Sequence, residues 1–142
     1  MVEFAVRKFN KEQHIELFRE WRAASSDTRE FDEGALSTTG FMAYEIEHHA
    51  VAEWKPVMCA FLVLTNTNWA IGEAVTANPR TSQETREAAL KALTDTMVIH
   101  AKALGFKRLL AYTNIESLGK KCVNVGWIAA ETNVTGYLKE LT

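Results

Sequence analysis

The segment from residue 69 to residue 112 predicts a strand, a long helix and a second strand, and this order constrains the fold most. In the predicted helix, residues 83–104, apolar side chains recur every three or four positions: Leu90, Leu93, Met97, Ala101 and Leu104. Gly105 is typical of the left-handed residue that follows a helix. Two strands joined by such a helix pair in parallel through a right-handed crossover.

The start of this helix has the pattern of a capping box, Thr81-Ser82-Gln83-Glu84. We expect the Thr81 hydroxyl to accept a hydrogen bond from the Glu84 backbone N–H. The Glu84 side chain would then reach back to the Thr81 backbone.

Further strands are predicted on both sides of this unit. Residues 57–64 form an uninterrupted apolar run, which is typical of a central strand covered on both faces. They should form a hairpin with residues 69–76. Residues 4–9, 41–46, 128–130 and 135–138 are further candidates, the last two as an antiparallel pair. Helices are expected after Asn10 and from about residue 114 to Asn124.

Composition narrows the function classes. The chain has 142 residues, 47% hydrophobic and 24% charged, as in an average globular protein and unlike a disordered one. Its 16 Lys and Arg against 18 Asp and Glu argue against general nucleic-acid binding. The longest apolar run, Val57–Leu64, is far shorter than the roughly 20 residues that cross a membrane. Only Cys59 and Cys122 are present, without metal-binding spacing, so we expect a cytoplasmic protein.

Charge is unevenly distributed along the chain. Residues 27–53 have a net charge of −6, whereas residues 79–121 have a net charge of +4. These segments can simply be two solvated faces. Alternatively, a cationic partner contacts one of them and an anionic ligand the other.

Three motifs, in this order, resemble the GNAT superfamily of acyl-CoA-dependent N-acetyltransferases. Strand residues 71–75 end at Asn78-Pro79 before the long helix, and residues 103–110 look like the family's helix-end glycine and fifth strand. Asn114 followed by Gly126-Trp127 is similar to the family's N…GF spacing. The resemblance implies an α/β (α+β) fold, a mixed central sheet of about six to seven strands with helices on both faces, in a single domain over residues 1–142.

In this family, acetyl-CoA lies between the splayed fourth and fifth strands, with its pyrophosphate on backbone amides at the start of the long helix. The resemblance implies cofactor contacts at Val75, Gln83, Thr85, Arg86 and Asn114. The family signature R/Q-x-x-G-x-G/A is degenerate here, because Arg86 replaces the central glycine and Glu84 and Glu87 add negative charge. An ordinary capped helix start explains this segment equally well.

Candidate catalytic residues also follow from the resemblance. Glu73 occupies the strand position of the family's general base, and Cys122 the position of its usual tyrosine general acid. Each also has a plain structural interpretation: a solvated edge glutamate and a small buried cysteine. Tyr112 and Tyr137 are substitutes for the acid only if the fold brings them to the site.

Other polar and aromatic residues are expected to be structural. We expect His14 to be solvated, His100 to border the helix core, and Trp21 and Trp54 to pack. Glu45 and His49 would share a helix face but specify no third ligand, so no metal site is predicted.

Two functions remain open from the sequence. The first is transfer of an acetyl group from acetyl-CoA to a primary amine, with residues 27–53 facing a cationic acceptor such as a polyamine or a protein lysine. The second is an inactive GNAT-fold protein that binds a protein partner, for example as a virion component, because similar small proteins are encoded by tailed phages. A homodimer is also considered.

Overall fold

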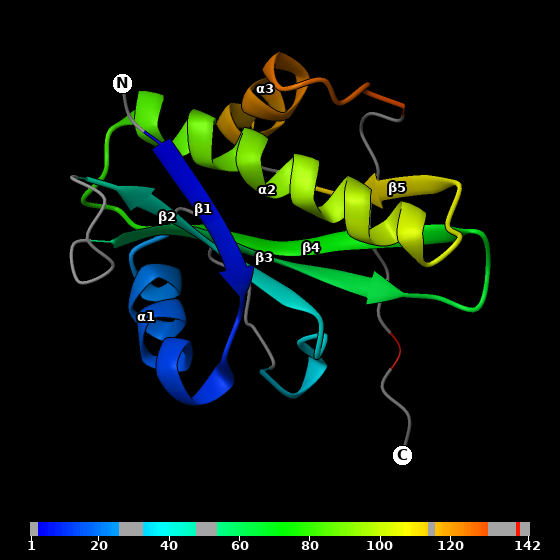
Figure 1. Cartoon of the computed structure of the whole chain (residues 1–142), viewed down its shortest axis with the longest axis horizontal. Coiled ribbons are helices and arrows are strands. Elements are labelled where there is room, and N and C mark those ends of the chain that lie inside the picture. The colour runs from blue at the N-terminus through cyan, green and yellow to red at the C-terminus, as the bar shows by residue number, and fades with distance from the viewer. Residues whose placement is uncertain (1–2, 26–32, 48–53, 114–115, 131–138, 140–142) are drawn as a thin grey trace.

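The computed structural model describes residues 3–25, 33–47, 54–113, 116–130 and 139. Its elements are, in chain order, β1 (Glu3–Lys8), α1 (Lys11–Ala23), a short 3-10 helix η1 (Glu33–Ala35), β2 (Gly40–Ile46), β3 (Lys55–Leu64), β4 (Trp69–Ala77), α2 (Gln83–Ala103), β5 (Arg108–Ala111) and α3 (Glu116–Asn124). The strands form one sheet in the order β1-β2-β3-β4-β5 (Figure 1). No helix in these ranges is long and apolar enough to span a membrane.

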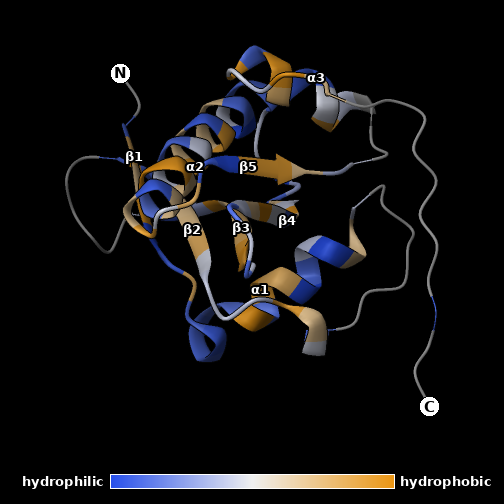
Figure 2. Cartoon of the chain, turned by 90° about the vertical axis from the view of Figure 1, so that its right-hand side faces the viewer, coloured by the Kyte–Doolittle hydropathy of each residue, from blue (hydrophilic) through white to orange (hydrophobic). Residues whose placement is uncertain are grey.

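The strand pairing is mixed, as the sequence predicted. Strands β1 to β4 pair antiparallel with their neighbours, and β4 pairs in parallel with β5 after the crossover through α2. Helices α2 and α3 lie on one face of the sheet and α1 on the other (Figure 2). The expected mixed sheet with helices on both faces is therefore confirmed.

The strand count is lower than predicted. Five strands occur in the described ranges, against the expected six to seven. Residues 128–130 do not form a strand, and their predicted partner, residues 135–138, lies outside the described residues.

The sheet separates two apolar cores because successive side chains of a strand point to opposite faces. On the α1 face, Phe18 and Trp21 of the helix pack on Met42, Cys59 and Phe61. The α2 face holds the larger core, in which Leu90, Leu93 and Met97 are fully buried. The continuous apolar run of β3 is explained by this burial on both sides.

Two details of α2 differ from the prediction. The N-cap is Ser82, whose hydroxyl accepts from the Thr85 backbone N–H at 3.1 Å. The Thr81 hydroxyl instead donates to the Asn78 carbonyl in the preceding turn.

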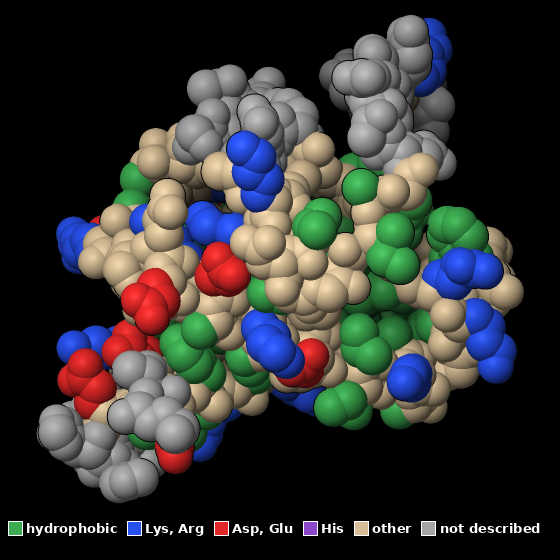
Figure 3. All heavy atoms as spheres, turned by 90° about the horizontal axis from the view of Figure 1, so that it is seen from above, with side chains coloured by type: hydrophobic (Ala, Val, Ile, Leu, Met, Phe, Trp, Pro, Cys, Tyr) green, Lys and Arg blue, Asp and Glu red, His purple; other side chains and the backbone are tan. Residues whose placement is uncertain are grey.

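At the other end of the helix, Gly105 has the expected positive φ of 90°. Leu104 was expected in the core but is 53% exposed, since the helix ends at Ala103 and Leu104 caps it. Figure 3, which views the molecule from above, shows hydrophobic side chains gathered on the right, beside several Lys and Arg side chains.

His14 was expected in solvent, and this was wrong. It is only 7% exposed, because its ring packs against Phe9 and Tyr44. Its Nδ1 accepts from the Asn10 backbone N–H at 2.8 Å, and its Nε2 lies 2.6 Å from the Tyr44 hydroxyl oxygen. Burial lowers the pKa of His14, so the folded protein favours the neutral ring.

A glycine contact on β2 yields a stability prediction. A Cβ at Gly40 would lie 2.6 Å from the Phe61 ring and 2.9 Å from the Cβ of Phe9. Gly40→Ala should therefore lower the free energy of unfolding by about 1–3 kcal/mol in urea denaturation. Gly72→Ala is the matched strand control, because its Cβ would meet nothing closer than 3.8 Å. Equal destabilisation by both variants would contradict this account.

The environment of His14 predicts a pH dependence of stability. Since its pKa is lower in the folded state, the unfolded chain binds the proton more readily, and stability falls as the pH drops below about 6.5. Above that pH the contribution is complete. His14→Gln should flatten the acid side of the unfolding free energy measured against pH, by no more than the slope for one proton, about 1.4 kcal/mol per pH unit. An unchanged slope in this variant would show that other groups cause the acid loss.

Candidate functional site

Strand β4 carries one residue more than its partner β3. Cys59 pairs with Thr76 and Phe61 pairs with Glu73, so three steps on β4 match two on β3. Ala74 lies in this bulge with a φ of 51°, which is uncommon for a residue other than glycine. The Thr76 hydroxyl donates to the Ala74 carbonyl at 2.9 Å and supports the bulge. Bulges of this kind re-aim side chains and occur next to active sites.

From Glu73 onward, β4 runs on without β5. The parallel pairing covers only Trp69–Gly72 against Arg108–Ala111, while β4 continues to Ala77. In the described part of the chain, residues 73–77 thus have no neighbour on the β5 side. This unpaired edge leads through a short turn to the start of α2.

Trp127 is fixed where β4 and β5 part. Its indole N–H donates to the Thr94 hydroxyl of α2 at 2.9 Å. Its ring would lie 3.9 Å from a Cβ on Gly72 of β4. From the sequence, Trp127 was only part of the Gly126-Trp127 motif. In the structure its side chain connects α2 with β4.

Glu73 lies directly before Ala74, at the bulge. Because it is paired with Phe61, which packs on α1, its side chain lies on the α1 face of the sheet. It is half-buried, and its carboxylate accepts from the Ser37 backbone N–H at 3.4 Å. Ser37 is itself held by its hydroxyl, which donates to the Leu62 carbonyl at 2.6 Å. The predicted base therefore lies between β4 and the segment that leads into β2.

The turn between β4 and α2 is built around Asn78. Its backbone N–H donates to the Val57 carbonyl at 2.7 Å, and its side-chain amide donates to the Pro56 carbonyl at 3.1 Å. Its side-chain oxygen accepts from the Arg80 backbone N–H at 3.0 Å. This network ties the start of α2 to the end of β4.

The first turn of α2 carries the predicted phosphate contacts. The Arg86 backbone N–H donates to the Ser82 carbonyl at 3.0 Å, and the Arg86 Nε donates to the same oxygen at 3.3 Å. The guanidinium group is therefore folded back along the first turn. Gln83 is exposed and Thr85 is half-buried, with its hydroxyl 2.9 Å from that of Ser82. A helix start with added positive charge is suited to an anion.

The remaining predicted site residues lie elsewhere. Val75 packs against the core on the α2 face, and Asn114 lies outside the described residues. Cys122 of α3 also packs on the α2 face, across the sheet from Glu73, and burial raises the pKa of its thiol. Tyr112 is 59% exposed just after β5, while Tyr137 lies outside the described residues.

Part of the acidic segment 27–53 is already paired. Glu33 accepts from Arg19 at 2.8 and 2.9 Å, and this contact lowers the pKa of Glu33. Glu47 lies 3.3 Å from Lys55. Asp27, Glu30, Asp32, His48, His49 and Glu53 lie outside the described residues. The rest of the chain shows no group of three side chains able to hold a metal ion.

The chain is similar to known proteins in its structure but matches none of those compared by sequence. No protein-family model and no curated protein matches the chain. A structure of AAC(6')-Iy in complex with the bisubstrate analogue CoA-S-monomethyl-acetylneamine has a TM-score of 0.64 at 17% identity, covering 98% of this chain and 99% of that one. A GNAT-family acetyltransferase from Streptococcus pneumoniae has a TM-score of 0.57 at 13% identity, with 99% and 98% covered.

A third similar structure is a much larger protein. N-acetylglutamate synthase from Neisseria gonorrhoeae, complexed with coenzyme A and L-arginine, has a TM-score of 0.58 at 15% identity. The match covers 83% of this chain and 26% of the synthase. At these identities the likeness concerns the fold alone. The chain therefore has the fold of the GNAT acetyltransferases.

Proposed function

We propose that this protein transfers an acetyl group from acetyl-CoA to a primary amine. The observation that carries this proposal is the course of β4 after Gly72. There the strand leaves β5, bulges at Ala74 beside Glu73, and leads into the start of α2. An unpaired strand edge, a carboxylate and a helix start thus follow one another within one short stretch of chain. Two structures of the same fold are complexes with CoA or a CoA-containing analogue.

The α2 start would hold the pyrophosphate of the cofactor. Backbone N–H groups in the first turn of a helix, here those of Gln83 and Glu84, have no partner within the helix. Arg86 compensates for the missing glycine by charge, because its guanidinium group lies along this turn and offsets Glu84 and Glu87. The pantetheine arm would then run along the unpaired edge of β4 past Val75, where backbone groups can hydrogen-bond to its amides.

Glu73 would act as the general base. The amine nitrogen attacks the thioester carbonyl carbon, a C–N bond forms, and the C–S bond to CoA breaks. Glu73 removes the proton that the nitrogen loses, directly or through a water molecule. The CoA thiolate leaves and takes up a proton, either from water or from Cys122, whose thiol packs on the α2 face of the sheet. Positioning both substrates at the β4 bulge would supply much of the acceleration.

The acceptor is a small or side-chain amine that reaches Glu73 from the α1 face. This follows from the place of Glu73 opposite Phe61 and next to Ser37. Since Glu33 and Glu47 are ion-paired, they offer less attraction to a cationic acceptor than the net charge of residues 27–53 suggests.

Acetyl-CoA binding tests the proposed cofactor site. Isothermal titration calorimetry should show binding to the wild type, and Arg86→Glu should weaken it by about tenfold or more because a charged contact is lost and a repulsive one is added. Lys91→Glu is the matched control: it makes the same charge change farther along α2, where Lys91 pairs with Asp95 at 2.9 Å. It should alter the affinity by less than about twofold.

Two results would count against this assignment. A folded wild-type protein that binds no acetyl-CoA at roughly millimolar concentration would reject the transferase function and favour the inactive protein-binding alternative. Equal effects of Arg86→Glu and Lys91→Glu would place the pyrophosphate elsewhere.

The role of Glu73 predicts a separation of binding from catalysis. With spermidine or a lysine peptide as the acceptor, Glu73→Gln should lower kcat by roughly 10²- to 10⁴-fold, the usual contribution of a general base. The dissociation constant for acetyl-CoA should stay unchanged. Glu45→Gln, a strand carboxylate on β2, should leave kcat unaltered. If Glu73→Gln retains full activity, the base is another group.

A further inference from the structure

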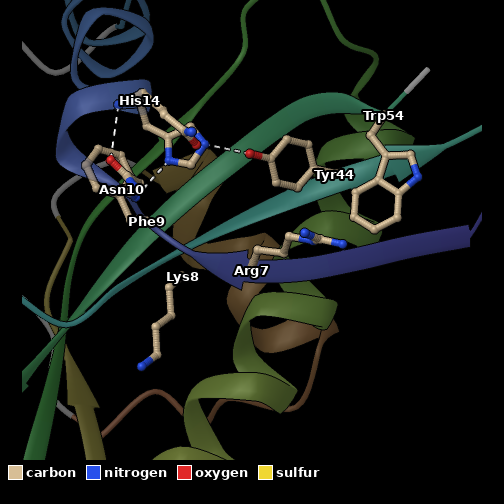
Figure 4. A pocket seen from close by; sticks show the side chains of 8 residues that line it. Arg7, Lys8, Phe9, Asn10, His14, Tyr44 and Trp54 are labelled. Atoms are coloured by element: carbon tan, nitrogen blue, oxygen red, sulfur yellow. Dashed lines mark hydrogen bonds between the residues drawn. The ribbon is translucent and has the colours of Figure 1, made fainter. Parts of the chain in front are cut away.

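A cavity of about 590 Å³ lies at the sheet edge formed by β1, beside the start of α1. Its walls include Arg7, His14, Tyr44 and Trp54 (Figure 4). The cavity does not include Glu73: Phe9 lines it, and the Phe61 ring, on the strand position opposite Glu73, meets the Phe9 ring edge to face with centroids 4.8 Å apart. The acetyl-transfer site proposed above therefore leaves this cavity unexplained.

The hydrogen bonds of His14 determine what Tyr44 can do. Because Nδ1 of His14 accepts from the Asn10 backbone N–H, the neutral ring carries its proton on Nε2. Nε2–H therefore donates to the Tyr44 oxygen at 2.6 Å. The Tyr44 hydroxyl proton is then free to be donated to another acceptor. Burial raises the pKa of Tyr44, so the hydroxyl keeps this proton at neutral pH.

Arg7 is held beside Tyr44 by Trp54. Its guanidinium carbon lies 4.4 Å from the centroid of the Trp54 ring, a cation–π contact. Arg7 pairs with Met42 of β2 and Ala5 pairs with Tyr44, so Arg7 is the diagonal neighbour of Tyr44 on the same face of the sheet. A guanidinium group stacked on a ring keeps its N–H edge available for hydrogen bonds to an oxyanion.

The other walls add no negative charge. The residues that line the cavity are Arg7, Lys8, Phe9, Asn10, Gln13, His14, Tyr44 and Trp54, without Asp or Glu. Lys8 points to the other side of β1 in Figure 4, in agreement with its pairing to Phe41 of the α2-side core. The Trp54 N–H lies on the far side of its ring from Tyr44 and is not counted among the donors. The groups that remain are hydrogen-bond donors with one full positive charge and an aromatic wall.

We propose that this cavity binds a small organic oxyanion, a carboxylate or phosphate monoester with a flat apolar body, as a second ligand of the protein. The oxyanion accepts hydrogen bonds from Arg7 and Tyr44, and the apolar body packs against the rings of Trp54 and Phe9. Charge-assisted hydrogen bonds of this type are the strong ones in ligand sites. The cavity volume lies in the usual range for small-molecule sites.

Titration with four related probes tests this proposal. Benzoate and phenyl phosphate distinguish the two oxyanions, while benzamide and benzylamine are the neutral and cationic counterparts. By calorimetry and saturation-transfer NMR, at least one oxyanion should bind with a roughly millimolar or lower dissociation constant, and the counterparts should bind at least about tenfold more weakly.

Variants assign the binding to this cavity. Arg7→Gln should weaken oxyanion binding by about tenfold and Tyr44→Phe by about fivefold. Lys91→Gln, a charge of α2 outside the cavity, should change the affinity by less than about twofold. Circular dichroism and thermal unfolding establish that each variant is folded, and Arg7, which is exposed, is the variant least coupled to folding.

Three outcomes would overturn the proposal. The first is that no oxyanion binds at about 10 mM, and the second is that benzamide binds as well as benzoate. The third is that acetyl-CoA displaces the probe while Arg7→Gln leaves the probe's affinity unchanged. This result would assign the probe to the start of α2. Because the probes do not require acetyl transfer, the oxyanion site can fail or succeed independently of the acetyltransferase function.

Discussion

The single extra residue in β4 is the constraint on which the proposed site depends. A regular pairing with β3 would carry β4 straight on from Gly72, whereas the bulge at Ala74 bends it as its pairing with β5 ends. The same bulge sets Glu73 on the α1 face, opposite Phe61. Ala74 has the positive φ that glycine adopts without strain, and residues held in such conformations occur preferentially at functional sites.

A second constraint is the aromatic packing on the α1 face. Phe9, Phe18 and Phe61 contact one another edge to face, and Phe61 leaves no room for a side chain at Gly40. Phe61 lies on the strand position opposite Glu73, and Phe9 lines the cavity beside Tyr44. Two chemically different environments therefore occur on one face of a small sheet: a carboxylate beside a strand bulge, and a set of donors with one positive charge.

Ion pairs reduce the effective charge of the acidic segment 27–53 and of the basic segment 79–121. Glu33 is paired with Arg19, and Arg80 lies 3.3 Å from Glu20, so the acidic and basic segments are partly neutralised by neighbours outside each segment. Exposed pairs of this kind contribute little stability, but they reduce the local field that a ligand meets. Arg86 has no such partner among the described residues and lies along the first turn of α2. Local geometry therefore says more than the segment charges about where an anion is attracted.

The sequence by itself determined most of the elements and their order, although residues 128–130 do not form the predicted strand. The periodicity of residues 83–104, Gly105 and the apolar run of β3 predicted the crossover and the central strand correctly, because burial and backbone conformation act locally. It could not determine contacts between distant residues. Ser82 rather than Thr81 caps α2, while the Thr81 hydroxyl bonds to the Asn78 carbonyl of the preceding turn. His14 is buried because Tyr44, thirty residues away, lies against it. An alanine in the sequence does not predict a bulge, so the bulge at Ala74 could not be foreseen. It arises only from the register between β3 and β4. Register and side-chain partners are set by packing across the sheet, and only the tertiary structure decides them.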